Sequence, residues 1–154
     1  EYIQVLKLKD RWTLTPSIYG GSTFGGESNH AYKFYSGSLG KNYLNNNREF
    51  PGLRFMELNF NETKDGVTDN YYAQNIGTVR ADLRWNFYGS HNLVLIGAAG
   101  TASHDIEQFA QSHHFGGFGL KYAIDSGFGP LELTVHKSTE NSNVFVYWNL
   151  GFWF

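Results

Sequence analysis

Apolar side chains recur at every second position through much of the chain. The clearest run lies at the C-terminal end, where one alternate set of positions holds Val144, Val146, Trp148, Leu150, Phe152 and Phe154. A period of two predicts a β-strand, and this run of about eleven residues matches the length with which a tilted strand crosses a bilayer. One face of this predicted strand is wholly apolar.

The same alternation predicts further strands upstream. Between Val79 and Phe87 the apolar positions alternate with Arg80, Asp82, Arg84 and Asn86, so charges of both signs share one face. Similar patterns occur at residues 12–19, 56–60, 118–124 and 131–135, and strand character without a clear face occurs at residues 2–8, 32–40 and 92–101. We therefore expect an all-β, antiparallel fold of about eight or nine strands.

The predicted connectors differ in length in a regular way. Short turns are expected at residues 9–10, 88–91 and 125–129, whereas longer polar loops are expected at 25–31, 41–51, 62–70, 102–113 and 138–143. Short turns at one end and long loops at the other are typical of transmembrane β-barrels, whose long loops lie outside the cell. The pattern predicts that residues 1–154 form one segment of an outer-membrane β-barrel.

Composition narrows the function classes. Aromatic residues make up 18% of the chain, with 18 Gly and 3 Pro, which favours strands joined by turns. With no Cys, a disulfide, a thiolate metal site and a Cys nucleophile are excluded. A net charge of −2 offers no basic face for nucleic acid. Since no apolar run approaches the roughly 18–20 residues of a membrane helix, a membrane form must be a closed barrel.

The last two predicted strands carry a recognisable combination of residues. The first opens with Gly129-Pro130-Leu131, and the second contains Asn149-Leu150-Gly151 before an aromatic end. This ending resembles the last two strands of the bacterial surface-antigen superfamily, which contains barrel-assembly factors, two-partner secretion transporters and outer-membrane patatin-like phospholipases. The resemblance covers roughly residues 34–154. It implies a barrel of roughly sixteen strands, of which this chain would form the C-terminal half.

The resemblance also implies a loop that folds into the barrel. The motif Phe50-Pro51-Gly52-Leu53 falls where the family has the tip of that loop. Assembly factors and secretion transporters carry an Arg-Gly pair at this tip and an Asp on the inner wall. Here Pro51 precedes Gly52, and residues 97–100 offer no Asp. The chain looks more like the barrels of patatin-like phospholipases, in which a Gly-x-Ser-x-Gly hydrolase domain precedes the barrel.

Candidate sites follow from this reading. We expect a polar ladder in the lumen made by Arg80, Asp82, Arg84 and Glu132, and an assembly signal made by Trp148, Leu150, Phe152 and Phe154. Glu132 and His136 share the predicted inner face without a catalytic role, since lumenal polar residues need none. His104, Asp105, His113 and His114 lack the spacing of a metal site and are read as surface residues. No cofactor is expected.

Three functions remain open. The first is a barrel that anchors or exports an N-terminal patatin-like lipolytic domain of the same polypeptide, with no catalysis in this segment. The second is a transporter or assembly-factor barrel of the same superfamily. The third is a soluble ligand-binding β-barrel, which shows the same alternation with its apolar side inward. The expected partners are outer-membrane lipid, the barrel-assembly machinery and the N-terminal domain.

Overall fold

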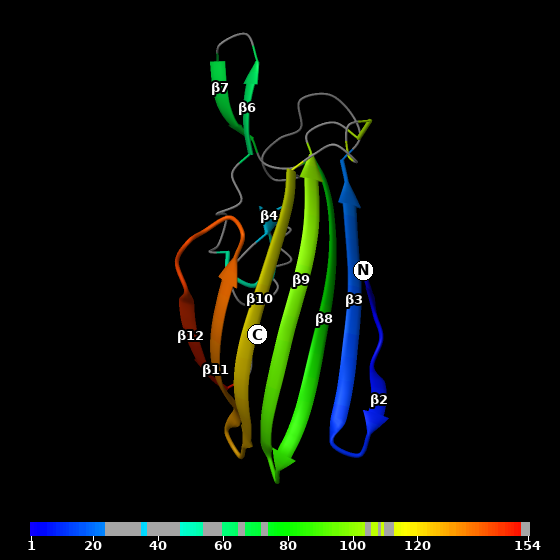
Figure 1. The fold of residues 1–154 in the computed structure, drawn as a ribbon, viewed down its shortest axis with the longest axis vertical. Helices are drawn as coiled ribbons and strands as arrows, with labels where there is room; N and C mark the ends of the chain where they lie inside the picture. The colour runs from blue at the N-terminus through cyan, green and yellow to red at the C-terminus, as the bar shows by residue number, and fades with distance from the viewer. Residues whose placement is uncertain are drawn as a thin grey trace.

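The body of the molecule is one curved antiparallel sheet (Figure 1). A computed structural model describes residues 1–23, 35–36, 47–53, 60–64, 67–71, 74–103, 106–107, 109 and 113–151 of the 154-residue chain. The sheet has eight strands in the order β1-β3-β8-β9-β10-β11-β12, and β2 also pairs with β3. Their bounds are β1 Tyr2–Ile3, β2 Leu6–Lys9, β3 Trp12–Ser22, β8 Asn75–Tyr88, β9 His91–Ser103, β10 His113–Ser126, β11 Gly129–Ser138 and β12 Phe145–Leu150.

The strands from β8 to β12 form an antiparallel meander. Tight turns join β8 to β9 and β10 to β11 at the lower end of Figure 1, and Gly89 supplies the left-handed backbone (φ 50°) that the first turn needs. Strand β3 pairs directly with β8 from Trp12↔Trp85 to Ser22↔Asn75. The chain between these two strands therefore leaves the sheet and returns to it.

The structure corrects one expectation about that intervening chain. Residues 62–70 were expected to be a loop, but strands β6 (Phe60–Lys64) and β7 (Val67–Tyr71) form an antiparallel hairpin there. Of the strand expected at 32–40 the structure describes only β4 (Tyr35–Ser36), paired in parallel with β5 (Asn47–Arg48), and the rest of that prediction lies outside the described residues. The strand predicted at 56–60 lies largely outside the described residues.

The outer face of the sheet is apolar across its full width. One lateral row of register partners, the middle row, consists of Leu14, Leu83, Leu95, Leu120, Val135 and Val146. Leu95 is 56% exposed and Val146 is 62% exposed. An unbroken band of large aliphatic side chains, four of the six exposed, is expected where the solvent is lipid rather than water. The predicted lipid-facing positions of β8, β10, β11 and β12 all lie on this face.

A second row lies two residues along each strand from the middle row, on the side of the short turns. This aromatic row consists of Trp12, Trp85, Leu93, Tyr122, Leu133 and Trp148. The rings of Trp12 and Trp85 stack at 5.5 Å with an interplanar angle of 6°. Aromatic girdles flank the apolar band of outer-membrane barrels, so the two rows together have the order expected of a membrane-embedded wall.

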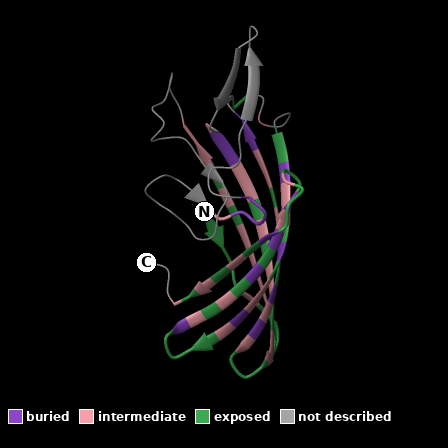
Figure 2. Ribbon diagram, turned by 90° about the vertical axis from the view of Figure 1, so that its left-hand side faces the viewer, coloured by how far each residue is buried: buried purple, intermediate pink, exposed green. Residues whose placement is uncertain are grey.

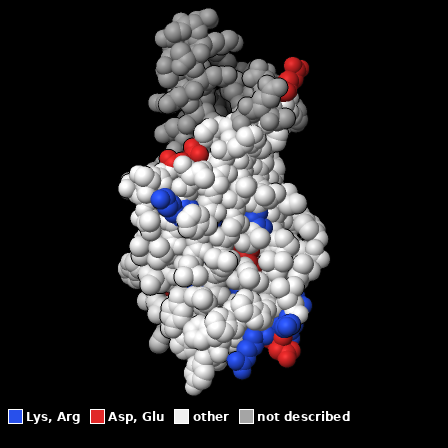
Figure 3. All heavy atoms as spheres, viewed as in Figure 1, with Lys and Arg blue, Asp and Glu red and all other residues white. Residues whose placement is uncertain are grey.

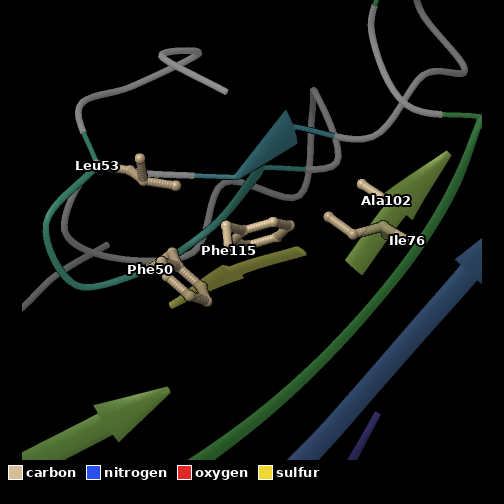
Figure 4. Packing of buried hydrophobic residues seen from close by; sticks show 5 residues of the cluster. All are labelled: Phe50, Leu53, Ile76, Ala102 and Phe115. Atoms are coloured by element: carbon tan, nitrogen blue, oxygen red, sulfur yellow. The ribbon is translucent and has the colours of Figure 1, made fainter. Parts of the chain in front are cut away.

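The inner face holds the buried residues (Figure 2). Both faces of strand β9 are apolar, since Val94 and Ile96 are buried on the inner side and Leu95 is exposed on the outer side. Its sequence therefore shows no clear alternation. The main buried apolar cluster contains Phe50, Leu53, Ile76, Ala102 and Phe115 (Figure 4). Two of its members, Phe50 and Leu53, come from outside the sheet.

Candidate functional site

The segment Glu49–Leu53 is docked on the inner face of the sheet. Phe50 is 2% exposed and Leu53 is fully buried, and the Leu53 N–H donates to the Phe50 carbonyl at 3.4 Å, which closes a tight turn. The ring of Phe50 meets that of Phe115 edge-on, with centroids 4.8 Å apart (Figure 4). A segment with this burial is part of the packed interior, and we call residues 49–53 the docked tip.

Gly52 makes the closest approach between the docked tip and strand β11. Its φ of 81° lies in the left-handed region, and a Cβ there would overlap the backbone of Lys137 and Ser138. Its N–H donates to Nδ1 of His136, and its carbonyl accepts from Ser138 Oγ at 2.9 Å. Both backbone polar groups of Gly52 are thus bonded to side chains of β11, as buried backbone groups require.

Glycines on the wall also make room for the tip. A Cβ at Gly117 of β10 would overlap the carbonyl oxygen of Pro51 and lie 3.0 Å from the Phe50 ring. At Gly119 a Cβ would lie 3.0 Å from Cβ of His136. Gly117 and Gly119 are the register partners of Ser138 and His136. Strand β10 therefore has no side chain on its inner surface where the tip and its polar partners pack against it.

An ion cluster holds the other side of the docked tip. Arg80 on β8 pairs with Glu49 of the tip at 3.0 Å and with Asp82 on its own strand at 2.6 Å and 2.9 Å. The side chain of Arg80 is only 17% exposed, so these pairs are weakly screened by solvent. Beside the cluster is a cavity of about 220 Å³ whose wall includes hydroxyls of Thr15, Ser17 and Thr78. The tip is thus fixed by charge on β8 and by hydrogen bonds on β11.

The four residues of the predicted lumen ladder separate into one pair and two residues that do not contact it. Arg80 and Asp82 belong to the ion cluster, and Glu132 lies 3.5 Å from Lys121 on the neighbouring strand. Arg84 is exposed and forms no ion pair with any described residue. The charges share one face, but they do not form a continuous ladder.

The candidate chemical sites can be placed as well. No group of three or more His, Asp or Glu side chains that could hold a metal is found in the described part of the chain. His113 pairs with Glu140 at 2.6 Å, while His104 and Asp105 lie outside the described residues. His136 accepts from the docked tip and Glu132 faces Lys121, so each of these two inner-face residues has a structural contact of its own.

Strand β12 presents the residues of the predicted assembly signal on the outer face. Trp148 is 75% exposed and Leu150 is 62% exposed, while Phe145, Tyr147 and Asn149 face inward. The described strand spans Phe145–Leu150, and Phe152 and Phe154 of the predicted signal lie outside the described part. Their role in assembly stays a prediction.

An antiparallel wall with an apolar outer face and a docked segment inside defines the class of outer-membrane β-barrels. Within this class, the chain matches the OMP85 superfamily over residues 2–154 and belongs to it. Members of this superfamily are outer-membrane proteins of Gram-negative bacteria. No curated protein matches the chain. Separately, no helix in the described part is long and apolar enough to cross a membrane.

Family membership confirms the superfamily resemblance and the all-β barrel fold, and it supports an outer-membrane barrel rather than a soluble one. The sequence reasoning missed the contacts of the docked tip. The sequence showed only that the family's Arg at the tip and Asp on the wall are both missing here. The structure instead contains an ion pair with the charges exchanged, with the carboxylate of Glu49 on the tip and Arg80 on the wall. Glu49 directly precedes Phe50-Pro51-Gly52, and this adjacency was the available signal.

Proposed function

We propose that this chain is the wall of an outer-membrane barrel that anchors or exports an N-terminal patatin-like lipolytic domain of the same polypeptide. The observation that carries the proposal is the docked tip. Its Phe-Pro-Gly-Leu sequence departs from the Arg-Gly pair of assembly factors and secretion transporters, and it resembles the tip of the phospholipase barrels.

The way the tip is held supports an anchoring role. The ion cluster, the two hydrogen bonds of Gly52 and the ring contact of Phe50 fasten one segment at three places across β8, β10 and β11. Releasing it would expose buried charge and apolar surface together, which is costly in a packed interior. A wall with a fastened inner segment suits a fixed anchor better than a conduit that must clear its lumen.

We expect no acyl transfer on the inner face of this segment. A serine nucleophile needs a base within hydrogen-bond reach and an oxyanion site beside it. Ser138 bonds the carbonyl of Gly52, and His136 accepts from the Gly52 N–H, so both are engaged in holding the tip. In this proposal the lipolytic chemistry belongs to the N-terminal domain.

Phospholipid hydrolysis by the full-length protein tests the proposal. We expect turnover that sediments with the outer-membrane fraction, and we expect removal of residues 1–154 to release the activity into the soluble fraction. Absence of hydrolysis, or hydrolysis that stays membrane-bound without residues 1–154, would contradict the anchor function.

A second function has support from the superfamily itself, which contains transporters and assembly factors. If the barrel acts in this way, depleting the protein from cells should lower the amounts of other outer-membrane barrels or of a secreted partner. Unchanged amounts of both, together with membrane-bound lipolysis, would favour the anchor.

A further inference from the structure

The aromatic row marks a boundary on the outer face near the short turns. Trp12 and Trp85 stack there, each more than a third exposed, and Phe87 lies 5.5 Å from Trp85. Indole rings prefer the zone where lipid hydrocarbon gives way to headgroups, because one part of the ring is apolar and the N–H is polar. The row therefore fixes the level of the lipid headgroups on this wall.

Polar contacts support this placement. Tyr122 of the row has its Oη 2.6 Å from Nδ1 of His91, which lies on the turn side. Also on the turn side, the Asn86 side-chain amide donates to the Gly89 carbonyl at 2.8 Å. In the opposite direction the next outer positions are those of the middle row, which is entirely aliphatic. The change from polar to aliphatic side chains occurs within one step of the row.

Two cations stand at this boundary. Lys9 is the register partner of Trp12, and the neighbouring Arg11 reaches the Phe87 carbonyl oxygen with Nη1 at 3.5 Å. The Arg11 carbonyl also accepts from the Asn86 N–H at 2.8 Å, which holds the β2–β3 turn against β8. Both side chains are exposed, as is Asp10 between them, so the turn carries two cations and one carboxylate. Lys9 lies level with the stacked indoles, and Arg11 lies on their turn side.

The cations are confined to one turn. The other two short turns at this end, residues 88–91 and 125–129, contain no Lys or Arg. Figure 3 shows charged side chains gathered at the lower end of the molecule, beside β2, with uncharged surface over much of the rest of that face. A general preference for basic residues at this end would have placed cations at all the turns.

We propose that Lys9 and Arg11, together with Trp12 and Trp85, bind the headgroup of an anionic phospholipid in the leaflet at the short-turn end. Phosphate oxygens accept charge-assisted hydrogen bonds from ammonium and guanidinium groups. The indoles beside them would contact the glycerol and upper acyl region. A lipid fits better than an acidic protein, because the aromatic row puts both cations at the membrane surface. This site is independent of which domain the barrel anchors.

Lipid retention by the full-length protein in mild detergent tests this proposal. The protein is incubated with equal amounts of phosphatidylglycerol and phosphatidylcholine, and retained lipids are counted by native mass spectrometry. We expect preferential retention of phosphatidylglycerol. The preference should fall about fivefold for each cation removed in Lys9→Gln and Arg11→Gln, and Arg11→Lys, which keeps the charge, should preserve it.

Matched controls separate this site from general charge effects. Lys137 lies on the outer face at the opposite end, so Lys137→Gln removes one cation without touching the site. An unchanged preference in Lys9→Gln/Arg11→Gln, or an equal loss in Lys137→Gln, overturns the proposal. Displacement of the retained lipid by free glycerol phosphate would also overturn it, since the site would then recognise a soluble phosphate rather than a membrane lipid.

Discussion

At the scale of single residues, the docked tip depends on a glycine that no other residue replaces without strain. Gly52→Ala should destabilise the barrel by about 2 kcal/mol or more, because a left-handed φ costs a non-glycine residue of order 1–3 kcal/mol and the new Cβ would overlap the backbone of β11. Urea unfolding in detergent measures the effect. Gly127→Ala is the control, since Gly127 has open space around it. Equal stability of both variants would contradict the docking.

Arg80 is the second residue on which the docking depends. Arg80→Gln leaves the carboxylates of Glu49 and Asp82 close together without their cation, and removing one partner from a shielded pair costs about 3 kcal/mol. Arg84→Gln, two residues along the same face, should change the free energy of unfolding by no more than about 0.5 kcal/mol, because Arg84 is exposed. The same urea titration measures the free energy of unfolding of both variants. Similar decreases for the two would contradict a specific role of the ion cluster in the docking.

At the scale of strands, each long strand carries a lipid-facing and a lumen-facing set. Leu95 lies in the middle row and is 56% exposed, so Leu95→Arg places a cation against hydrocarbon at a cost of about 2–4 kcal/mol. Asn149→Arg is the matched change on the inner face of β12, where a cation can reach water. We expect Leu95→Arg to reduce the membrane-inserted fraction in cells and Asn149→Arg to reduce it much less. Equal effects would mean that the faces are assigned wrongly.

The strands also show how far the sequence could predict the structure. Strands β3, β8, β10, β11 and β12 were found because a wall between lipid and lumen imposes a strict period of two. Strand β9 was found without its faces, because Val94 and Ile96 are apolar on the inner side, where they are buried. The β6–β7 hairpin was mistaken for a loop, because its polar residues show no apolar alternation.

The contacts of the docked tip could not be predicted from the alternation of apolar and polar residues. Resemblance located Phe50-Pro51-Gly52-Leu53 as a loop tip, but its partners lie far away in the sequence, on strands whose register sets the contact. His136 was read as an ordinary inner-face residue, and Ser138 as the first residue of a polar loop rather than the last of β11. That these residues together hold the tip follows only from the strand register, which places Gly117 opposite Ser138.

At the scale of the whole molecule, the described sheet has two edges. Strand β12 pairs only with β11 among the described residues, and β1 pairs only with β3. Unpaired edges are not tolerated in hydrocarbon, where every backbone group needs a partner. Closing the barrel therefore requires strands beyond those of the described sheet, and the expectation that this chain forms part of a larger barrel stays a prediction.

The central claim is that the curved sheet is a membrane wall with lipid on its outer face and a polar lumen within. Single cysteines placed in turn at residues 145–150 of the full-length protein in membranes test it most directly. Cysteines at 146, 148 and 150 should react with a lipid-soluble maleimide and resist a charged one. Those at 145, 147 and 149 should show the opposite preference wherever reagent reaches the lumen. A reversed pattern, or uniform reaction with the charged reagent at all six positions, would contradict the account.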